Sequence, residues 1–247
     1  MNSNVNVWFL HHSCFAIEIK DYLLLFDYYK DEPVPPDPIS PEYSWDTLWP
    51  QAFKTKKVRV FSSHKHGDHF NPVILSWQDH FDDIHYFFSR DISKKYVTDK
   101  VTVIKAHEEL QWGELKVKAL RSTDLGVAFL LGLEGLKLYH AGDLHWWHWN
   151  EEDEAWNKNM AARFKKEISL LKGISLDLAF VPLDPRQEDA AFLGIEYFLN
   201  QVEVKTVFPM HFWENYSIMD ELKVRAKANP LLEKVLPIDA RGRHFAL

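Results

Sequence analysis

The chain has 247 residues and a formal net charge of -7, with 46% hydrophobic and 26% charged residues, which is the composition of an ordinary globular protein. The acidic balance argues against a dedicated nucleic-acid binder, and the single cysteine, Cys14, excludes a disulfide framework and a thiolate zinc site. No apolar run approaches the ~20 residues of a membrane helix, and the N-terminus lacks the pattern of a secretory leader. We therefore expect a cytoplasmic protein that has neither a membrane nor a nucleic acid as a partner.

The first part of the chain is rich in predicted β-strands. Residues 5–10, 14–19 and 22–29 are short runs of β-forming residues. Five prolines between positions 33 and 41 exclude a helix or a central strand there, and they predict a surface loop. The next strand is expected at residues 57–63, directly before a cluster of histidines.

Helices and strands alternate in the rest of the chain. A helix is expected at 71–81, opening between 68 and 71, because proline stands just inside its start. The charged amphipathic segment 150–172 predicts another helix. The remaining expectations are strands at 84–88, 101–106, 176–183 and 206–210, hairpins turning at 112–113 and 134–135, helices at 191–202 and 217–228, and strands at the C-terminus. No repeat or linker divides the chain, so we expect residues 1–247 to form a single domain.

The segment "FSSHKHGDHF", residues 61–70, contains four metal-binding side chains within six positions: His64, His66, Asp68 and His69. Residues i and i+2 of an extended segment point the same way, so the first two can bind one ion together. The turn from strand to helix can direct the other two toward a second position. Imidazole and carboxylate are typical ligands of zinc, manganese or iron, and the pattern favours a metal site over a solvated polar turn.

This cluster resembles the signature of the metallo-β-lactamase fold superfamily, and later motifs follow the order of that family. Asp27, at the end of "LLLFD", resembles its supporting aspartate. Asp143 in "LYHAGD" resembles the aspartate that bridges two metals, and His211 in "VFPMHFW" the late histidine of the second metal site. The opening "FLHHSCFAIE" resembles the lactonase-like branch that includes ascorbate-6-phosphate lactonase, which makes His12 a pocket histidine.

The resemblance implies a mixed α/β (α+β) fold, a four-layer αββα sandwich. It also implies metal ligation by His64, His66, Asp68, His69, Asp143 and His211, with one or two ions of Zn²⁺, or alternatively Mn²⁺ or Fe²⁺. One position departs from the family pattern. The third histidine of the first metal site is missing, and Ser122 stands in its place, with Asp124 two residues later. Asp124, His145 or water are the candidates to replace it.

Three further residues are candidates for contact with a substrate. His145 lies just beyond Asp143, on the kind of loop where substrates are often bound. Asp184 and Arg186 follow a predicted buried strand in "VPLDPRQ". Arg186 is suited either to binding a carboxylate or phosphate or to a turn held by Asp184 and Pro185. Both interpretations are left open.

The function implied is metal-dependent hydrolysis of a small molecule, a lactone, an ester or a phosphorylated sugar acid, with Asp68 orienting the nucleophile or transferring a proton. One alternative is a phosphodiesterase or nuclease of the same fold, against which the acidic balance argues. The other is a degenerate metal-binding scaffold without activity. Metal stoichiometry separates the enzyme from the scaffold, because a scaffold needs no open coordination position.

Overall fold

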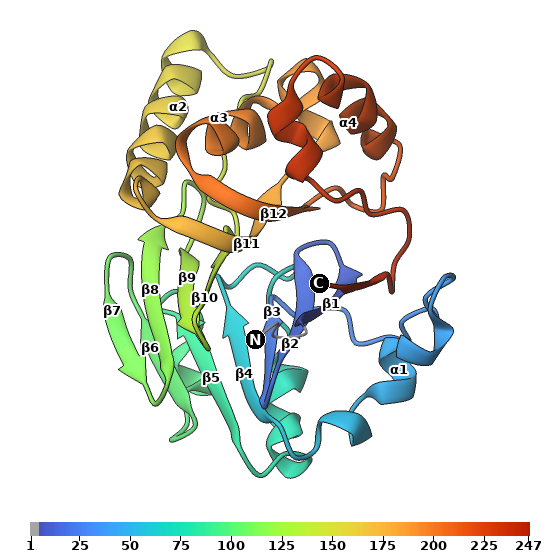
Figure 1. Cartoon of the computed structure of the whole chain (residues 1–247). Helices are drawn as coiled ribbons and strands as arrows, with labels where there is room; N and C mark the ends of the chain where they lie inside the picture. Colours follow the sequence, from blue (N-terminus) through green and yellow to red (C-terminus); the bar gives the residue numbers. More distant parts are fainter. Residues whose placement is uncertain (1–4) are drawn as a thin grey trace. The chain divides into compact units, whose positions relative to one another are not determined.

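The computed structural model describes residues 5–247. Residues 1–4 lie outside the described residues, and the expectation that the N-terminus is not a leader concerns them in part. The chain divides into two compact units. Unit 1 contains the N-terminal part up to Ile104 together with Ile238–Leu247, and unit 2 is Lys105–Pro237. Each unit contains one β-sheet (Figure 1).

The sheet of unit 1 has seven strands in the order β13-β1-β2-β3-β4-β5-β6. The strands from β13 to β3 pair in antiparallel fashion, and those from β3 to β6 pair in parallel. Their bounds are β1 Val5–His11, β2 Cys14–Ile19, β3 Tyr22–Phe26, β4 Lys57–Ser62, β5 Ile84–Ser89, β6 Val101–Ile104 and β13 His244–Ala246. All the strands predicted for this part of the chain are confirmed.

An aromatic stack fixes the end of β4, the strand that leads into the histidine cluster. Phe26, Phe61 and Phe87 occupy paired positions on β3, β4 and β5. Successive ring centroids are 4.9 Å apart, with nearly parallel planes. All three side chains are buried, and burial of aromatic rings contributes strongly to core stability. The cluster after β4 is therefore anchored on the interior of unit 1.

The connections of unit 1 contain short helical turns. The helix predicted at 71–81 is a 3₁₀ helix, η3 Pro72–Asp79, and the side chain of Asn71 caps it by accepting a hydrogen bond from the Val73 amide. The proline-rich loop contains only the 3₁₀ turn η1 Pro41–Tyr43, as expected for such a sequence. Among residues 5–104 and 238–247 the single α-helix is α1 Trp45–Leu48, which was not predicted, because four residues carry no helical period.

The sheet of unit 2 has six strands in the order β12-β11-β10-β9-β8-β7. The pairs β12–β11 and β11–β10 are parallel, and the remaining pairs are antiparallel hairpins. The bounds are β7 Glu109–Trp112, β8 Leu115–Arg121, β9 Val127–Leu133, β10 Leu136–His140, β11 Ser175–Pro182 and β12 Glu203–Met210. Gly113 and Gly135 have positive φ at the two predicted hairpin turns, a conformation that favours glycine.

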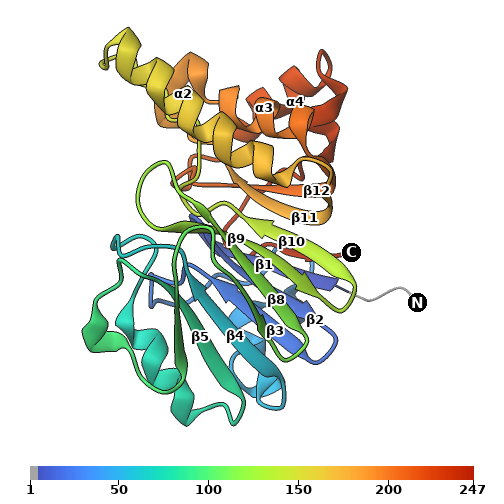
Figure 2. The same cartoon turned by 90° about the vertical axis from the view of Figure 1, so that its left-hand side faces the viewer.

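Three α-helices belong to unit 2: α2 Glu154–Ile168, α3 Leu193–Gln201 and α4 Ile218–Ala226. They lie on the same side of β11 and β12 (Figures 1 and 2). Asp153 caps α2 by accepting a hydrogen bond from the Trp156 amide, so this helix begins four residues later than predicted. The two sheets and their helices confirm the mixed α/β class. Among residues 5–247, no helix is long and apolar enough to cross a bilayer.

Candidate metal centre

Asp27 organises the histidine cluster of unit 1. Its carboxylate accepts hydrogen bonds from the Ser63 amide and the Ser63 hydroxyl, each at 2.7 Å. The same carboxylate lies 2.8 Å from Nδ1 of His69. A histidine whose Nδ1–H is bound to a carboxylate presents its Nε2 lone pair as a more basic metal ligand. Asp27 and His69 are fully buried, and Asp27 has a positive φ of 46°, a strained conformation often found at functional sites.

His64 and His66 form a contact pair beside this carboxylate. His64 Nδ1 lies 2.9 Å from the Ser63 hydroxyl, and its Nε2 lies 3.0 Å from Nδ1 of His66. The ring centroids of His64 and His69 are 4.1 Å apart. Three imidazoles are thus grouped at the end of one strand, as the i, i+2 spacing predicted for the first two.

His12 joins the same group from a different part of unit 1. It lies in the two-residue turn between β1 and β2, yet it is fully buried. Its φ of 49° is uncommon for a residue other than glycine. Its Nε2 lies 3.6 Å from the carboxylate of Asp68. His12, Asp68 and His69 each offer a ligand atom within 4.8 Å of the other two, a spacing that one metal ion can bridge.

Unit 2 contains a second group of metal-binding side chains, at the ends of neighbouring strands. Asp143 follows β10, and His211 follows β12 with a φ of 67°. Both side chains are buried, and His211 Nε2 lies 3.4 Å from Asp143 Oδ1. The ligand atoms of Asp124 and Asp143 also lie within 4.8 Å of each other.

Asp184 holds His211 as Asp27 holds His69. Its Oδ2 lies 2.9 Å from Nδ1 of His211, and the backbone amide and guanidinium of Arg186 also bind this carboxylate. Burial raises the pKa of Asp184, but these donors outweigh it and lower the pKa to about 2. Burial lowers the pKa of His211, but the carboxylates of Asp143 and Asp184 outweigh it and raise the pKa to about 9.

Arg186 therefore takes part in a turn around Asp184, the second of the two interpretations left open by the sequence. Asp184 caps the 3₁₀ helix η6 Pro185–Ala190 by accepting a hydrogen bond from the Arg186 amide. Asp184 is fully buried, so the structure places it behind His211, where it positions the imidazole. The sequence had placed it among residues that line a pocket.

Thr123 and Trp147 hold the backbone of Asp143. The Thr123 hydroxyl lies 3.1 Å from the Asp143 carbonyl oxygen and 2.7 Å from that of His145, and it accepts from the His145 amide. Trp147 Nε1 donates to the Asp143 carbonyl at 3.1 Å. Ser122, in place of the missing histidine, is buried and accepts a hydrogen bond from the Asp124 amide. Its hydroxyl shapes the turn that presents Asp124.

The structure places His145 in the interior of unit 2. Its ring is fully buried, with Nε2 2.6 Å from the Gln187 side-chain oxygen. Burial lowers the pKa of His145 to about 4, so the ring is neutral near pH 7. It packs edge-on against Trp147.

Several residues of this arrangement were not found in the sequence: Ser63, Thr123, Gln187 and Gly194. The first three are common polar residues with no distinctive spacing, and only their contacts reveal them. Gly194 did carry a signal, because a glycine inside a predicted helix costs stability relative to alanine and can therefore indicate a packing requirement. His140, the last residue of β10, accepts a hydrogen bond from the Gly142 amide. Cys14 is a buried strand cysteine whose pKa is raised by burial.

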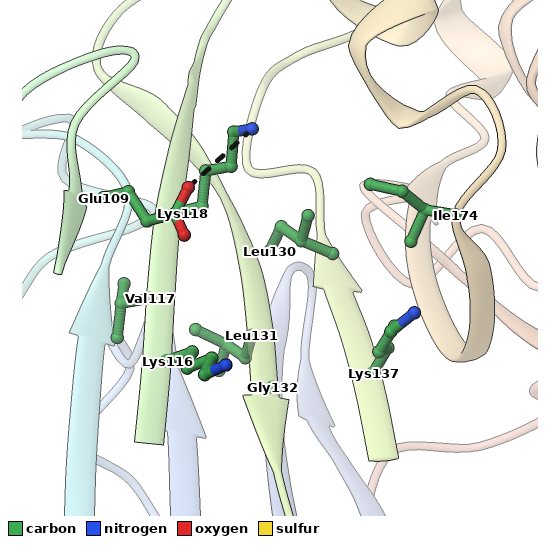
Figure 3. Close-up of a pocket in the computed structure, with 9 residues that line it drawn as sticks. All are labelled: Glu109, Lys116, Val117, Lys118, Leu130, Leu131, Gly132, Lys137 and Ile174. Carbon is green, nitrogen blue, oxygen red and sulfur yellow. Dashed lines mark ion pairs between the residues drawn. The ribbon is translucent and has the colours of Figure 1, made fainter. Parts of the chain in front are cut away.

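A hollow of about 230 Å³ opens on the sheet of unit 2 (Figure 3). It lies over β8, β9 and β10, where Gly132 has no side chain and Leu130 and Ile174 form the apolar wall. Lys116, Lys118 and Lys137 line it, and Lys118 forms an ion pair with Glu109 at 3.9 Å. None of the predicted site residues lines this hollow.

Comparison with known proteins identifies the family and the fold. Residues 6–158 match the model of the beta-lactamase superfamily domain. The chain is similar in structure to Igni18, a metallo hydrolase from Ignicoccus hospitalis, with 14% identity, 99% of each chain covered and a TM-score of 0.66. It is also similar to the metallo-β-lactamase fold protein YhfI from Bacillus subtilis, with 12% identity, 100% of each chain covered and a TM-score of 0.64.

A third similar structure is CmlA, a diiron β-hydroxylase from Streptomyces venezuelae, with 11% identity and a TM-score of 0.59. All of the present chain is covered, but only 54% of CmlA. None of the curated proteins matches this sequence significantly.

The family model covers well over half of the chain. The protein therefore belongs to the metallo-β-lactamase superfamily, and the fold expected from the histidine cluster is confirmed.

Proposed function

We propose that the protein is a metal-dependent hydrolase whose active site combines the histidine cluster of unit 1 with the Asp143–His211 group of unit 2. The observation that carries the proposal is the repetition of one device in both units. In each unit a buried carboxylate lies within 2.9 Å of Nδ1 of a buried histidine. Membership of the superfamily supports joining the two groups, because its metal sites use ligands in this sequence order.

The donor set fits a divalent ion. His64, His66, His69 and His211 offer imidazole nitrogens, and Asp68, Asp124 and Asp143 offer carboxylates, which together suit zinc, manganese or iron. We propose that His64, His66, Asp143 and Asp124 hold one ion, with Asp124 replacing the missing histidine, and that Asp68, His69, Asp143 and His211 hold the other. When bound, such ions lower the pKa of water and polarise the bond to be cleaved.

Asp68 is the residue we propose to orient the nucleophile and to move a proton. Its carboxylate is one quarter exposed, whereas those of Asp27 and Asp184 are buried and bound to histidines. It lies 3.6 Å from His12 Nε2 and 3.9 Å from His69 Nε2. A carboxylate that faces both solvent and imidazole can pass a proton between them. His12 would orient Asp68 or contact the substrate.

The substrate proposed is a small lactone, ester or phosphorylated sugar acid, following the resemblance of the segment around His12 to the lactonase-like branch. Arg186 contributes positive charge in unit 2, but its guanidinium is bound to Asp184. If Arg186 binds a substrate anion, it would do so while its guanidinium also holds Asp184.

The test is metal analysis of protein purified without chelators, followed by assays with lactone, ester and phosphodiester substrates. Bound divalent metal together with hydrolysis of a lactone or ester is the expected result. Hydrolysis of phosphodiesters alone would move the protein to the nuclease alternative. Tightly bound metal without hydrolysis of any substrate would favour the scaffold and contradict the proposal.

A further inference from the structure

We propose that His145 and Gln187 are positioning residues that fix Asp143 relative to His211, and that Gly194 provides the space that this arrangement requires. The inference rests on the proposed function, since it assigns Asp143 and His211 to metal binding. It concerns three residues of unit 2 that would touch neither the metal nor the substrate.

The first step of the argument is the loop that follows Asp143. The ring of His145 binds the Gln187 side-chain oxygen through Nε2 at 2.6 Å. The side-chain amide nitrogen of Gln187, Nε2, donates to the backbone carbonyl oxygens of Trp146 and His148, at 2.9 Å and 3.3 Å. One buried glutamine thus binds three residues of this loop. A buried polar group that loses its hydrogen-bond partner is costly. The contacts between Gln187 and the loop therefore hold residues 145–148 in one conformation.

The second step links Gln187 to His211. Gln187 belongs to η6, the same 3₁₀ helix that Asp184 caps. The backbone N–H of Gln187 donates to the backbone carbonyl oxygen of Asp184 at 3.1 Å. Asp184 in turn binds Nδ1 of His211. A continuous set of hydrogen bonds therefore runs from the loop of Asp143, through Gln187 and Asp184, to His211. These hydrogen bonds connect the segment after β10 with the segment after β12. They fix Asp143 and His211, whose side chains lie 3.4 Å apart.

The third step explains Gly194. A glycine within a helix costs roughly 1 kcal/mol relative to alanine, yet Gly194 lies in α3 and is buried. A Cβ atom at this position would lie 2.3 Å from Cε1 and 2.5 Å from Nδ1 of His145. Trp147 and Phe164 pack against the same ring, so the ring has little room to move. Gly194 is therefore required by the position of His145.

The experiment is calorimetric titration of metal-free protein with Zn²⁺, using Gly194→Ala as the main variant. This variant changes no ligand and no hydrogen-bonding group, but it displaces the His145 ring. Zinc affinity should fall roughly 10–100-fold, the usual cost of disturbing the groups that orient metal ligands. Gly132→Ala is the matched control, because its Cβ would lie at an ordinary 3.5 Å from Lys116 Cβ, and it should bind zinc like the natural protein.

A double variant separates positioning from a general loss of packing. His145→Ala should weaken zinc binding by itself, because Gln187 loses its partner. Adding Gly194→Ala to it should weaken binding no further, because the clash is gone. If Gly194→Ala does not fold by circular dichroism, Gln187→Met replaces it and should lower zinc affinity by a similar factor.

The outcomes distinguish this inference from the proposed function. A natural protein that binds none of Zn²⁺, Mn²⁺ and Fe²⁺ would overturn the proposed function itself. Natural protein that binds zinc, with folded Gly194→Ala or Gln187→Met binding it equally well, would overturn the positioning role alone. Additive losses in the double variant would also overturn it, since they would mean that Gly194 acts independently of His145.

Discussion

Asp184 Oδ2 lies 2.9 Å from His211 Nδ1, and both side chains are buried in unit 2. Asp27 Oδ2 lies 2.8 Å from His69 Nδ1 in unit 1. The two pairs come from unrelated segments of the chain, yet each fixes a histidine through the same ring nitrogen. In both cases Nε2, on the far side of the ring from the carboxylate, is the nitrogen that we propose as the metal ligand.

The first prediction concerns this carboxylate–histidine pair in unit 2. Asp184→Asn keeps the shape of the side chain but removes its charge, so Nε2 of His211 becomes a weaker ligand. Metal affinity should fall roughly 10–100-fold, measured by calorimetric titration. Asp177→Asn is the control, because that carboxylate pairs with Lys205 at the surface and should not affect binding. Unchanged affinity in Asp184→Asn would show that the pair does not serve a metal ligand.

The second prediction is that His69→Ala removes metal and hydrolytic activity together. Loss of a ligand should lower metal affinity by more than the roughly 10–100-fold that is lost when a residue hydrogen-bonded to a ligand is removed. Metal content and turnover are measured on the same preparation, with His80→Ala, an exposed histidine of unit 1, as the control. Activity that persists after the metal is lost would mean that the metal is not the catalyst.

The third prediction concerns the missing histidine. The site with Asp68, His69, Asp143 and His211 should fill at low metal concentration, and the site with His64 and His66 only with excess metal or bound substrate. A histidine at position 122 would add the imidazole ligand that this site lacks, so Ser122→His should tighten the weaker site. Asp124→Ala should weaken that site alone. Titration of metal-free protein gives both affinities, and two equally tight sites in the natural sequence would contradict the prediction.

The fourth prediction concerns the pH dependence of stability in unit 1. Burial and the Arg59 guanidinium lower the pKa of His85 to about 4, although Asp83 and Asp99 raise it. The unfolded chain therefore binds one more proton than the folded protein between about pH 4 and 6.5. Stability contributed by neutral His85 is present above pH 6.5 and is lost as the pH falls through 4, by roughly 3 kcal/mol at most.

His85→Gln tests this. The variant should lose less stability than the natural protein between about pH 6.5 and 4, as measured by urea unfolding at each pH. Glutamine keeps a hydrogen-bonding side chain beside Thr102, the partner of His85 Nε2 at 2.8 Å, but it does not titrate, so the comparison isolates the charge. Parallel pH profiles for the two proteins would show that folding does not lower the pKa of His85.

The sequence predicted the sheets well because each strand is a short run of β-forming residues ended by a turn. The helix expected at 71–81 is present, as a 3₁₀ helix. The four-residue α1 was missed, because a helix that short has no periodic signal. The ligand candidates were visible because histidines two residues apart after a strand are rare. Asp184 was visible too, but its role was not, since its partner His211 is 27 residues away.

Residues that position others were the hardest to predict. Gln187 binds His145, Trp146 and His148 from 39 to 42 positions away, and no spacing in the sequence indicates such contacts. Gly194 could have been noticed as a glycine inside a helix. Only the structure identifies the imidazole that occupies the space it leaves.

The most direct test of the account is a crystal structure of the protein grown with Zn²⁺ or Mn²⁺, with the ions located by anomalous scattering. The account predicts an ion bound by His69 of unit 1 and His211 of unit 2 at once, with Asp143 as a shared ligand. Ions bound by residues of one unit only, with His69 and His211 far from a common ion, would contradict it.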